Sequence, residues 1–246
     1  PPRPQGTERN VVVSIWEWGT EIDYIQAEIV TDKRNPRVNA NGPVYGVNIS
    51  NDELAVLDPV TGQASNLDVP LRVDPNTVPG MIARSMPAPS RFFGDELIWN
   101  DPANPHNPMM DQKGRVWMTS AIRNRANPDY CRDGSDNAYA QYFPLDNGFR
   151  SAVYYDPEAE EFVMVDTCFG THHLQFAEDE SNTLYFSGGG QVIGWLDTAI
   201  WDETGDEVAA QGWCPTVLDT NGDGVITKPW NEPPRRGEPD SRDPQL

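Results

Sequence analysis

The sequence predicts an all-β protein, more precisely a β-propeller of four-stranded antiparallel blades, on the basis of three observations. The 246 residues include 23 Pro and 20 Gly but are only 37% hydrophobic, which is typical of many short strands joined by turns. Two different strand-turn-strand patterns each occur twice along the chain. Their order produces four-stranded units, and such units repeated around an axis are the blades of a propeller.

The first pattern is an apolar strand, a polar turn with neighbouring Gly or Asn, and a second strand that carries an aromatic residue. It occurs at 106–119 and again at 173–187, and the second strands of the two copies are 68 residues apart. The second pattern is a hairpin whose turn is marked by Asp-Pro, at 151–166 and earlier at 53–70. Together the two patterns predict about three blades.

The central blade is expected to have strands at about 107–111, 115–120, 151–156 and 161–166. The next blade is expected at 173–177, 183–187, 191–196 and 213–218, and an earlier, incomplete one at 11–16, 53–58 and 64–69. Long insertions separate these strands, at 20–45, 71–104 and 121–150. The propeller domain is therefore expected to cover 1–228, followed by a Pro-rich loop or linker at 229–246.

Three blades are fewer than the roughly 4–8 with which propellers close. An open arc of blades would expose sheet edges and an apolar face, which proteins in water avoid. We therefore expect the chain to be a segment of a larger propeller, completed by further blades of the same protein or by another chain. Because the chain starts with Pro and has no apolar leader, either a leader was removed or the chain is an excerpt.

The stretch Pro-His-Asn-Pro-Met-Met-Asp-x-x-Gly-Arg-Val-Trp-Met-Thr, at 105–119, resembles the blade repeat of the streptogramin-lyase-like propellers, the virginiamycin B lyase group. The Asp-Pro-x-Thr-Gly turn at 58–62 is similar to the outer hairpin of that group. The resemblance covers most of 44–218, and the insertions bring the chain closer to the longer relatives, whose activities are unassigned. The resemblance implies proton abstraction by a His at the channel mouth, with magnesium and acidic residues. Candidates for the acidic partner are Asp95, Glu96 and Asp101.

The three histidines of the chain are expected to lie together. In a four-stranded meander, the loops between the second and third strands and the loops between blades lie on one side. His106, His172 and His173 each immediately precede or begin a first strand, so they should share one mouth of the channel. Imidazole is a good metal ligand and a natural general base. We expect catalysis there and a second divalent metal; the alternative is that the histidines only cap strands.

The cysteines indicate the compartment. Cys131, in the insertion 121–150, and Cys168, in the loop before the next blade, should lie on this same side, which predicts a disulfide between them. A disulfide with one free thiol, Cys214, fits a secreted or periplasmic protein. Three unrelated buried thiols are the alternative.

A calcium loop is predicted near the C-terminal end, at 219–225. Its ligands would be the side chains of Asp219, Asn221 and Asp223 and the carbonyl of Val225, with Gly at the sixth position. The twelfth position holds Trp230 instead of Glu, so Asp206 or Glu232 would have to replace that ligand. The alternative is an Asx-rich turn without metal.

The charge balance excludes one class of partner. With 38 acidic and 18 basic residues the formal net charge is −20, which repels the phosphates of nucleic acid. No run approaches the ~18 apolar residues of a membrane span.

Three functions remain open. The first is a metal-assisted, lyase-like enzyme that acts on a small cyclic ester or carbohydrate-like ligand. The second is a non-catalytic binding or structural propeller that displays loops to a partner. The third is an iron site like that of four-His propellers, which would need ligands beyond the three histidines.

Overall fold

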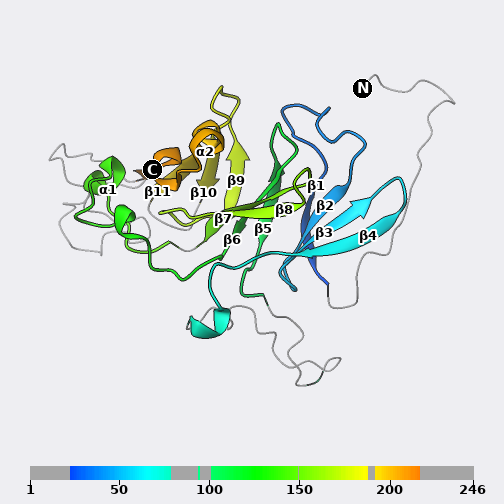
Figure 1. Cartoon of the computed structure of the whole chain (residues 1–246), viewed down its shortest axis with the longest axis horizontal. Coiled ribbons are helices and arrows are strands. Elements are labelled where there is room, and N and C mark those ends of the chain that lie inside the picture. Colours follow the sequence, from blue (N-terminus) through cyan, green and yellow to red (C-terminus); the bar gives the residue numbers. More distant parts are fainter. Residues whose placement is uncertain (1–22, 79–93, 95–100, 149, 188–191, 217–246) are drawn as a thin grey trace, which may run out of the picture.

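The fold of the computed structural model, described for residues 23–78, 94, 101–148, 150–187 and 192–216, is dominated by β-sheet (Figure 1). It contains three antiparallel sheets of four strands, each strand pairing with its neighbours in chain order. The first sheet consists of β1 (Ile25–Ile29), β2 (Val44–Asn48), β3 (Glu53–Asp58) and β4 (Gln63–Asp68). The second consists of β5 (His106–Met110), β6 (Val116–Ser120), β7 (Ser151–Asp156) and β8 (Glu161–Val165). The third consists of β9 (His173–Phe176), β10 (Leu184–Ser187), β11 (Val192–Leu196) and β12 (Gln211–Pro215).

Helices are short and lie in the connections. They are α1 (Ala138–Tyr142), α2 (Thr198–Thr204) and α3 (Glu207–Ala210), with 3-10 turns at Pro75–Thr77 and Asp129–Cys131. Asp206, which the sequence offered as a replacement calcium ligand, accepts hydrogen bonds from the first backbone N–H groups of α3 and is its N-cap. No helix of the described residues is long and apolar enough to cross a membrane.

The predicted all-β class is confirmed, and the second and third sheets contain the four strands expected for each. The first sheet differs from the prediction. The strand expected at 11–16 lies outside the described residues, whereas β1 and the start of β2 occupy part of the expected insertion at 20–45. The sequence of β1, Ile-Gln-Ala-Glu-Ile, alternates apolar with polar residues as a half-buried strand does, so this signal was missed, whereas β2 contains Gly46 and Asn48, which are rare in strands.

The three sheets pack face to face, with the second in the middle. Between the first and second sheets lies a core that includes Tyr45, Val47, Leu54, Met118 and Val153. Between the second and third sheets lies another, which includes Trp117, Tyr154, Leu174, Phe186 and Leu196. The second sheet therefore buries both of its faces, and every residue of β6 is buried.

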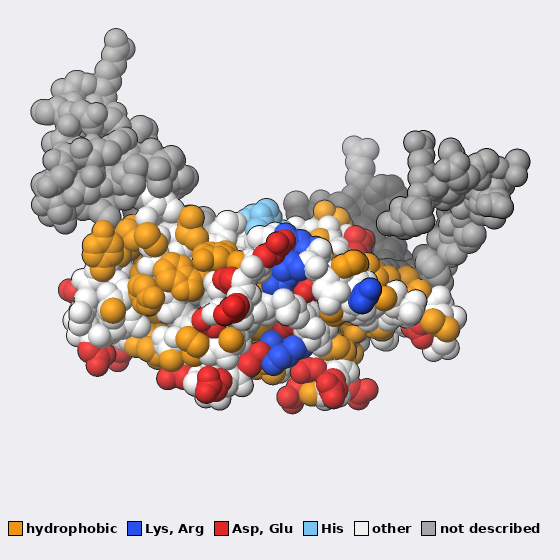
Figure 2. Space-filling view, turned by 90° about the horizontal axis from the view of Figure 1, so that it is seen from above, with side chains coloured by type: hydrophobic (Ala, Val, Ile, Leu, Met, Phe, Trp, Pro, Cys, Tyr) orange, Lys and Arg blue, Asp and Glu red, His pale blue; other side chains and the backbone are white. Residues whose placement is uncertain are grey.

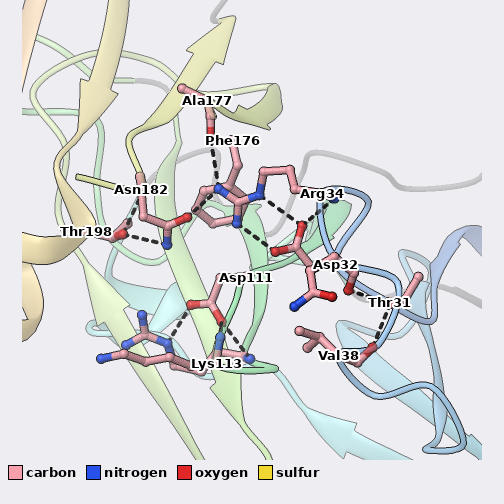
Figure 3. Close-up of polar contacts among 12 residues, drawn as sticks. Thr31, Asp32, Arg34, Val38, Asp111, Lys113, Phe176, Ala177, Asn182 and Thr198 are labelled. Atoms are coloured by element: carbon pink, nitrogen blue, oxygen red, sulfur yellow. Dashed lines mark hydrogen bonds and ion pairs between the residues drawn. The ribbon is translucent and has the colours of Figure 1, made fainter. Parts of the chain in front are cut away.

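The first strands of the three sheets are neighbours: β5 packs beside both β1 and β9. At the end of these strands, Arg34 of the β1–β2 loop joins the first sheet to the third (Figure 3). Its guanidinium donates to the carbonyl of Ala177 at 2.8 Å and to the side chain of Asn182, and it lies 4.5 Å over the ring of Phe176. Asp32 pairs with it at 2.9 Å, and both side chains are buried.

The predicted disulfide is confirmed. Cys131 is bonded to Cys168, with their Cα atoms 5.4 Å apart, and Cys214 is free and exposed. The bond ties the 121–150 connection to the loop between β8 and β9. Both segments therefore lie at the end of the sheets where β9 begins.

Candidate metal centre

The structure brings together the three histidines that were expected to meet. His106 is the first residue of β5, His173 is the first residue of β9, and His172 directly precedes it. The ring centres are 4.5 Å apart for His106 and His172, 5.3 Å for His106 and His173, and 4.2 Å for His172 and His173. His106 is buried, whereas His172 and His173 are exposed, and histidine reaches the surface in Figure 2.

Hydrogen bonds between β5, β6 and β9 position the backbone of these residues. The single proton of the buried Thr119 hydroxyl is shared between two carbonyls within hydrogen-bond distance, those of His106, at 3.3 Å, and of His172, at 3.0 Å. The side-chain oxygen of Asn107 accepts from the backbone N–H of Leu174 at 3.4 Å. The register of β5 also shifts just after His106, which is a β-bulge of the kind that redirects side chains near functional sites.

Burial and neighbouring charge lower the pKa of two of the imidazoles, those of His106 and His172. Burial lowers the pKa of His106 to about 4, and the charges of Arg150, His172 and His173 lower it further. Burial also lowers the pKa of His172, with smaller effects of His173 and Arg150. Near pH 7 both rings are therefore neutral, which is the form that binds a metal.

One ring nitrogen of His106 is available to a ligand. Its Nδ1 faces the side-chain oxygen of Gln26, from β1. Its Nε2 is buried and has no hydrogen-bond partner within the part of the chain that is described. Because buried nitrogen atoms normally have a partner, this atom marks a position where a metal or ligand atom fits.

The donor set suits a transition metal. One nitrogen from each of the three rings can be chosen so that all lie within 4.8 Å of one another. A metal bound at about 2.0–2.1 Å allows two nitrogens to be at most ~4.2 Å apart, so the exposed rings of His172 and His173 need to turn inward. Three imidazoles suit zinc, iron, nickel or copper, whereas magnesium prefers oxygen ligands. The magnesium implied by the resemblance therefore does not fit this nitrogen donor set.

Of the three acidic residues proposed as partners of the histidines, the structure describes only Asp101. Asp101 is buried and accepts from the side chain of Asn104 at 2.9 Å, while Asp95 and Glu96 lie outside the described residues. Asp101 is absent from the three-His group that could hold a metal among the described residues.

A buried polar network, which the sequence did not predict, holds the loop that leads into His106. Asp52, in the β2–β3 turn, accepts from the backbone N–H groups of Ala103, at 2.6 Å, and Asn104, at 2.7 Å. Arg150, just before β7, donates to the carbonyl and side-chain oxygens of Asn104. Burial raises the pKa of Asp52 to about 7, although the two backbone donors and Arg150 oppose the shift.

The expected calcium ligands Asp219, Asn221, Asp223 and Val225, and the linker 229–246, lie outside the described residues. Beside the His cluster, a pocket of about 350 Å³ opens on the third sheet, with His173, Tyr185 and Ile193 among its lining residues. No protein-family model matches the sequence, and a search of curated proteins found no match.

Proposed function

We propose that the chain is part of a secreted or periplasmic β-propeller that binds a divalent transition metal through His106, His172 and His173. We further propose that this centre serves a metal-assisted, lyase-like reaction on a small cyclic ester or carbohydrate-like ligand. The observation that carries the proposal is the convergence of three imidazoles, one of which has a buried nitrogen without a hydrogen-bond partner among the described residues. Neutral His106 and His172 add to it, because protonated rings would repel a cation.

A catalytic role fits a centre with three protein ligands among the described residues. Catalytic zinc sites use three protein ligands and leave a position for water or substrate, whereas structural zinc sites use four. A divalent metal bound here would supply Lewis-acid polarisation of a substrate oxygen. The chain itself contributes the buried His106, whose Nδ1 contacts the side chain of Gln26, and the exposed His172 and His173.

The propeller part of the proposal is supported by a repeated aromatic pair. In the second sheet, Trp117 lies opposite Tyr154, with ring centres 4.4 Å apart, and the pair is buried against the third sheet. At the equivalent positions of the third sheet, Tyr185 lies opposite Trp195, with ring centres 6.4 Å apart. This second pair faces away from the second sheet, and Tyr185 is 43% exposed.

A further four-stranded sheet on this face would bury the second pair as the third sheet buries the first. Figure 2 shows hydrophobic side chains gathered at the end of the molecule that carries the third sheet and α1; the exposed hydrophobic residues there include Tyr139, Tyr142, Tyr185 and Ile193. We propose that this sheet comes from the same protein or from another chain. A patch of this kind also favours the second candidate function, a non-catalytic propeller that binds a partner.

The compartment and the calcium loop belong to the same proposal. The Cys131–Cys168 disulfide supports an oxidising compartment, because such bonds are rare in reducing ones. The loop at 219–225 is proposed to hold calcium on the pattern of its residues alone, in a structural role.

Metal titration tests the centre. Metal-free protein, kept in millimolar calcium to occupy weak carboxylate sites, is titrated with zinc in a calorimeter and with cobalt by absorption. One equivalent is expected to bind, and His106→Ala should weaken binding more than ~100-fold, because loss of an outer partner alone costs about 10–100-fold. Glu161→Gln, at an exposed position of β8, controls for zinc bound by surface carboxylates and should leave the affinity unchanged.

Two results would contradict the proposal. One is the absence of a stoichiometric zinc site in the wild-type protein. The other is unchanged affinity in His106→Ala and His172→Ala. The enzyme part is tested separately with a panel of cyclic esters. Turnover that survives both removal of the metal and His106→Ala would show that the reaction does not use this centre, and absence of turnover in the wild type would leave only the binding function.

A further inference from the structure

Gln26, in strand β1, contacts the ring of His106, the buried member of the three-His group. Gln26 lies where the register of β1 shifts, between the pairs Ile25–Asn48 and Glu28–Gly46. A bulge of this kind adds a residue and changes the direction of the side chains around it. Since β1 packs beside β5, the side-chain oxygen of Gln26 comes into hydrogen-bond contact with Nδ1 of His106.

With the amide oxygen of Gln26 turned toward the ring, this contact favours one of the two neutral tautomers of His106. An amide oxygen can only accept a hydrogen bond, so the Nδ1 that faces it must be the donor. A neutral imidazole has one N–H, which leaves Nε2 of His106 as a bare acceptor. Nε2 is the same atom that is buried without a hydrogen-bond partner among the described residues.

We infer that Gln26 is a positioning residue of the metal centre, which holds His106 in the Nδ1–H tautomer and presents Nε2 as the metal ligand. The inference rests on the proposed function for the identity of the ligand, but the tautomer itself exists without metal. Histidines that bind metals usually donate their second N–H to an oxygen that fixes the ring, and loss of that oxygen costs about 10–100-fold in affinity. Gln26 supplies that oxygen from a different sheet.

The tautomer can be measured directly in metal-free protein. Long-range ¹H–¹⁵N correlation spectra distinguish a protonated from a bare ring nitrogen, and the His106 signals are assigned by their loss in His106→Ala. The wild-type protein is expected to show a protonated Nδ1 and a bare Nε2. Gln26→Leu, which keeps the size but removes the oxygen, should give a mixture of the two tautomers.

Zinc titration of the same variants gives the second measurement. Gln26→Leu should bind zinc about 10–100-fold more weakly than wild type, whereas Gln26→Glu, which retains an acceptor oxygen, should restore the affinity. Gln63→Leu, the same change at an exposed position of β4, is the control and should leave both the tautomer and the affinity unchanged.

The possible outcomes separate this inference from the proposed function. A protonated Nε2 in wild type, or wild-type zinc affinity in Gln26→Leu, would overturn the role of Gln26 while leaving the metal centre in place. Absence of zinc binding in wild type would instead overturn the proposed function. In that case the spectra still decide whether Gln26 fixes the ring of His106.

Discussion

Replacing Arg34 by Leu should lower the free energy of unfolding by about 3–5 kcal/mol, because it leaves a buried carboxylate without its cation. The Arg34 side chain is 6% exposed and that of its partner Asp32 is 1% exposed, so water cannot take over the charge. Arg34 also donates to Ala177 and Asn182 of the β9–β10 turn, and these hydrogen bonds join the first sheet to the third (Figure 3). The expected loss of stability therefore has two causes, an unpaired buried charge and the missing contact between the first and third sheets.

Urea unfolding followed by Trp fluorescence measures this loss. The double variant Asp32→Asn/Arg34→Leu should recover part of the stability, since it has no unpaired charge. Lys113→Leu is the control, because Lys113 is 61% exposed and its ion pair with Asp202 is expected to contribute at most ~1 kcal/mol. If Arg34→Leu destabilised the protein no more than Lys113→Leu, the bridge would not hold the sheets together.

Three further predictions concern other parts of the chain. Replacing both Cys131 and Cys168 by Ala should cost about 4 kcal/mol in a urea titration, because the bond closes a loop with a sequence separation of 37; an unchanged midpoint would contradict this. Burial raises the pKa of Asp52 from 3.8 to about 7, so the folded state binds a proton that the unfolded state has released, and stability should fall as the pH rises from about 4 to about 7. At about 1.4 kcal/mol per pH unit this amounts to at most ~4 kcal/mol, and Asp52→Asn should flatten that pH dependence; equal slopes in both proteins would refute the assignment. Calcium should raise the melting temperature of the wild type, and Asp223→Ala should abolish that increase, whereas an equal increase in the variant would rule out the loop as the site.

The strands of the second and third sheets could be predicted because each carries a local signal. The turns at Asp156-Pro157 and around Gly114 separate apolar runs of strand length, so β5 to β8 begin and end within about one residue of their expected positions. The strand β1 carries a local signal too, an alternation of apolar and polar residues, but it is short and only half buried. Its pairing with β2 and its packing against β5 were not evident from the sequence.

The meeting of the three histidines followed from topology, because all of them stand at the start of a first strand. Their polar surroundings did not. Asp52 and Asn104 are 52 residues apart, and Gln26 and His106 are 80 apart, so these hydrogen bonds depend on how whole sheets pack. No spacing rule within a single strand could have indicated them. The starts of α2 and α3, by contrast, have a local signal, because Asp197 and Asp206 are N-cap residues whose side chains accept from backbone N–H groups two and three residues later.

The choice of expression host matters for any measurement on this protein. Cys168 lies four residues before His172, so the disulfide anchors the chain on its approach to the His cluster. Material produced in a reducing cytoplasm would lack that anchor and would let the His172–His173 segment move away from His106. Zinc affinities measured on such material would understate those of the oxidised protein, and refolding in air or export to the periplasm should restore them.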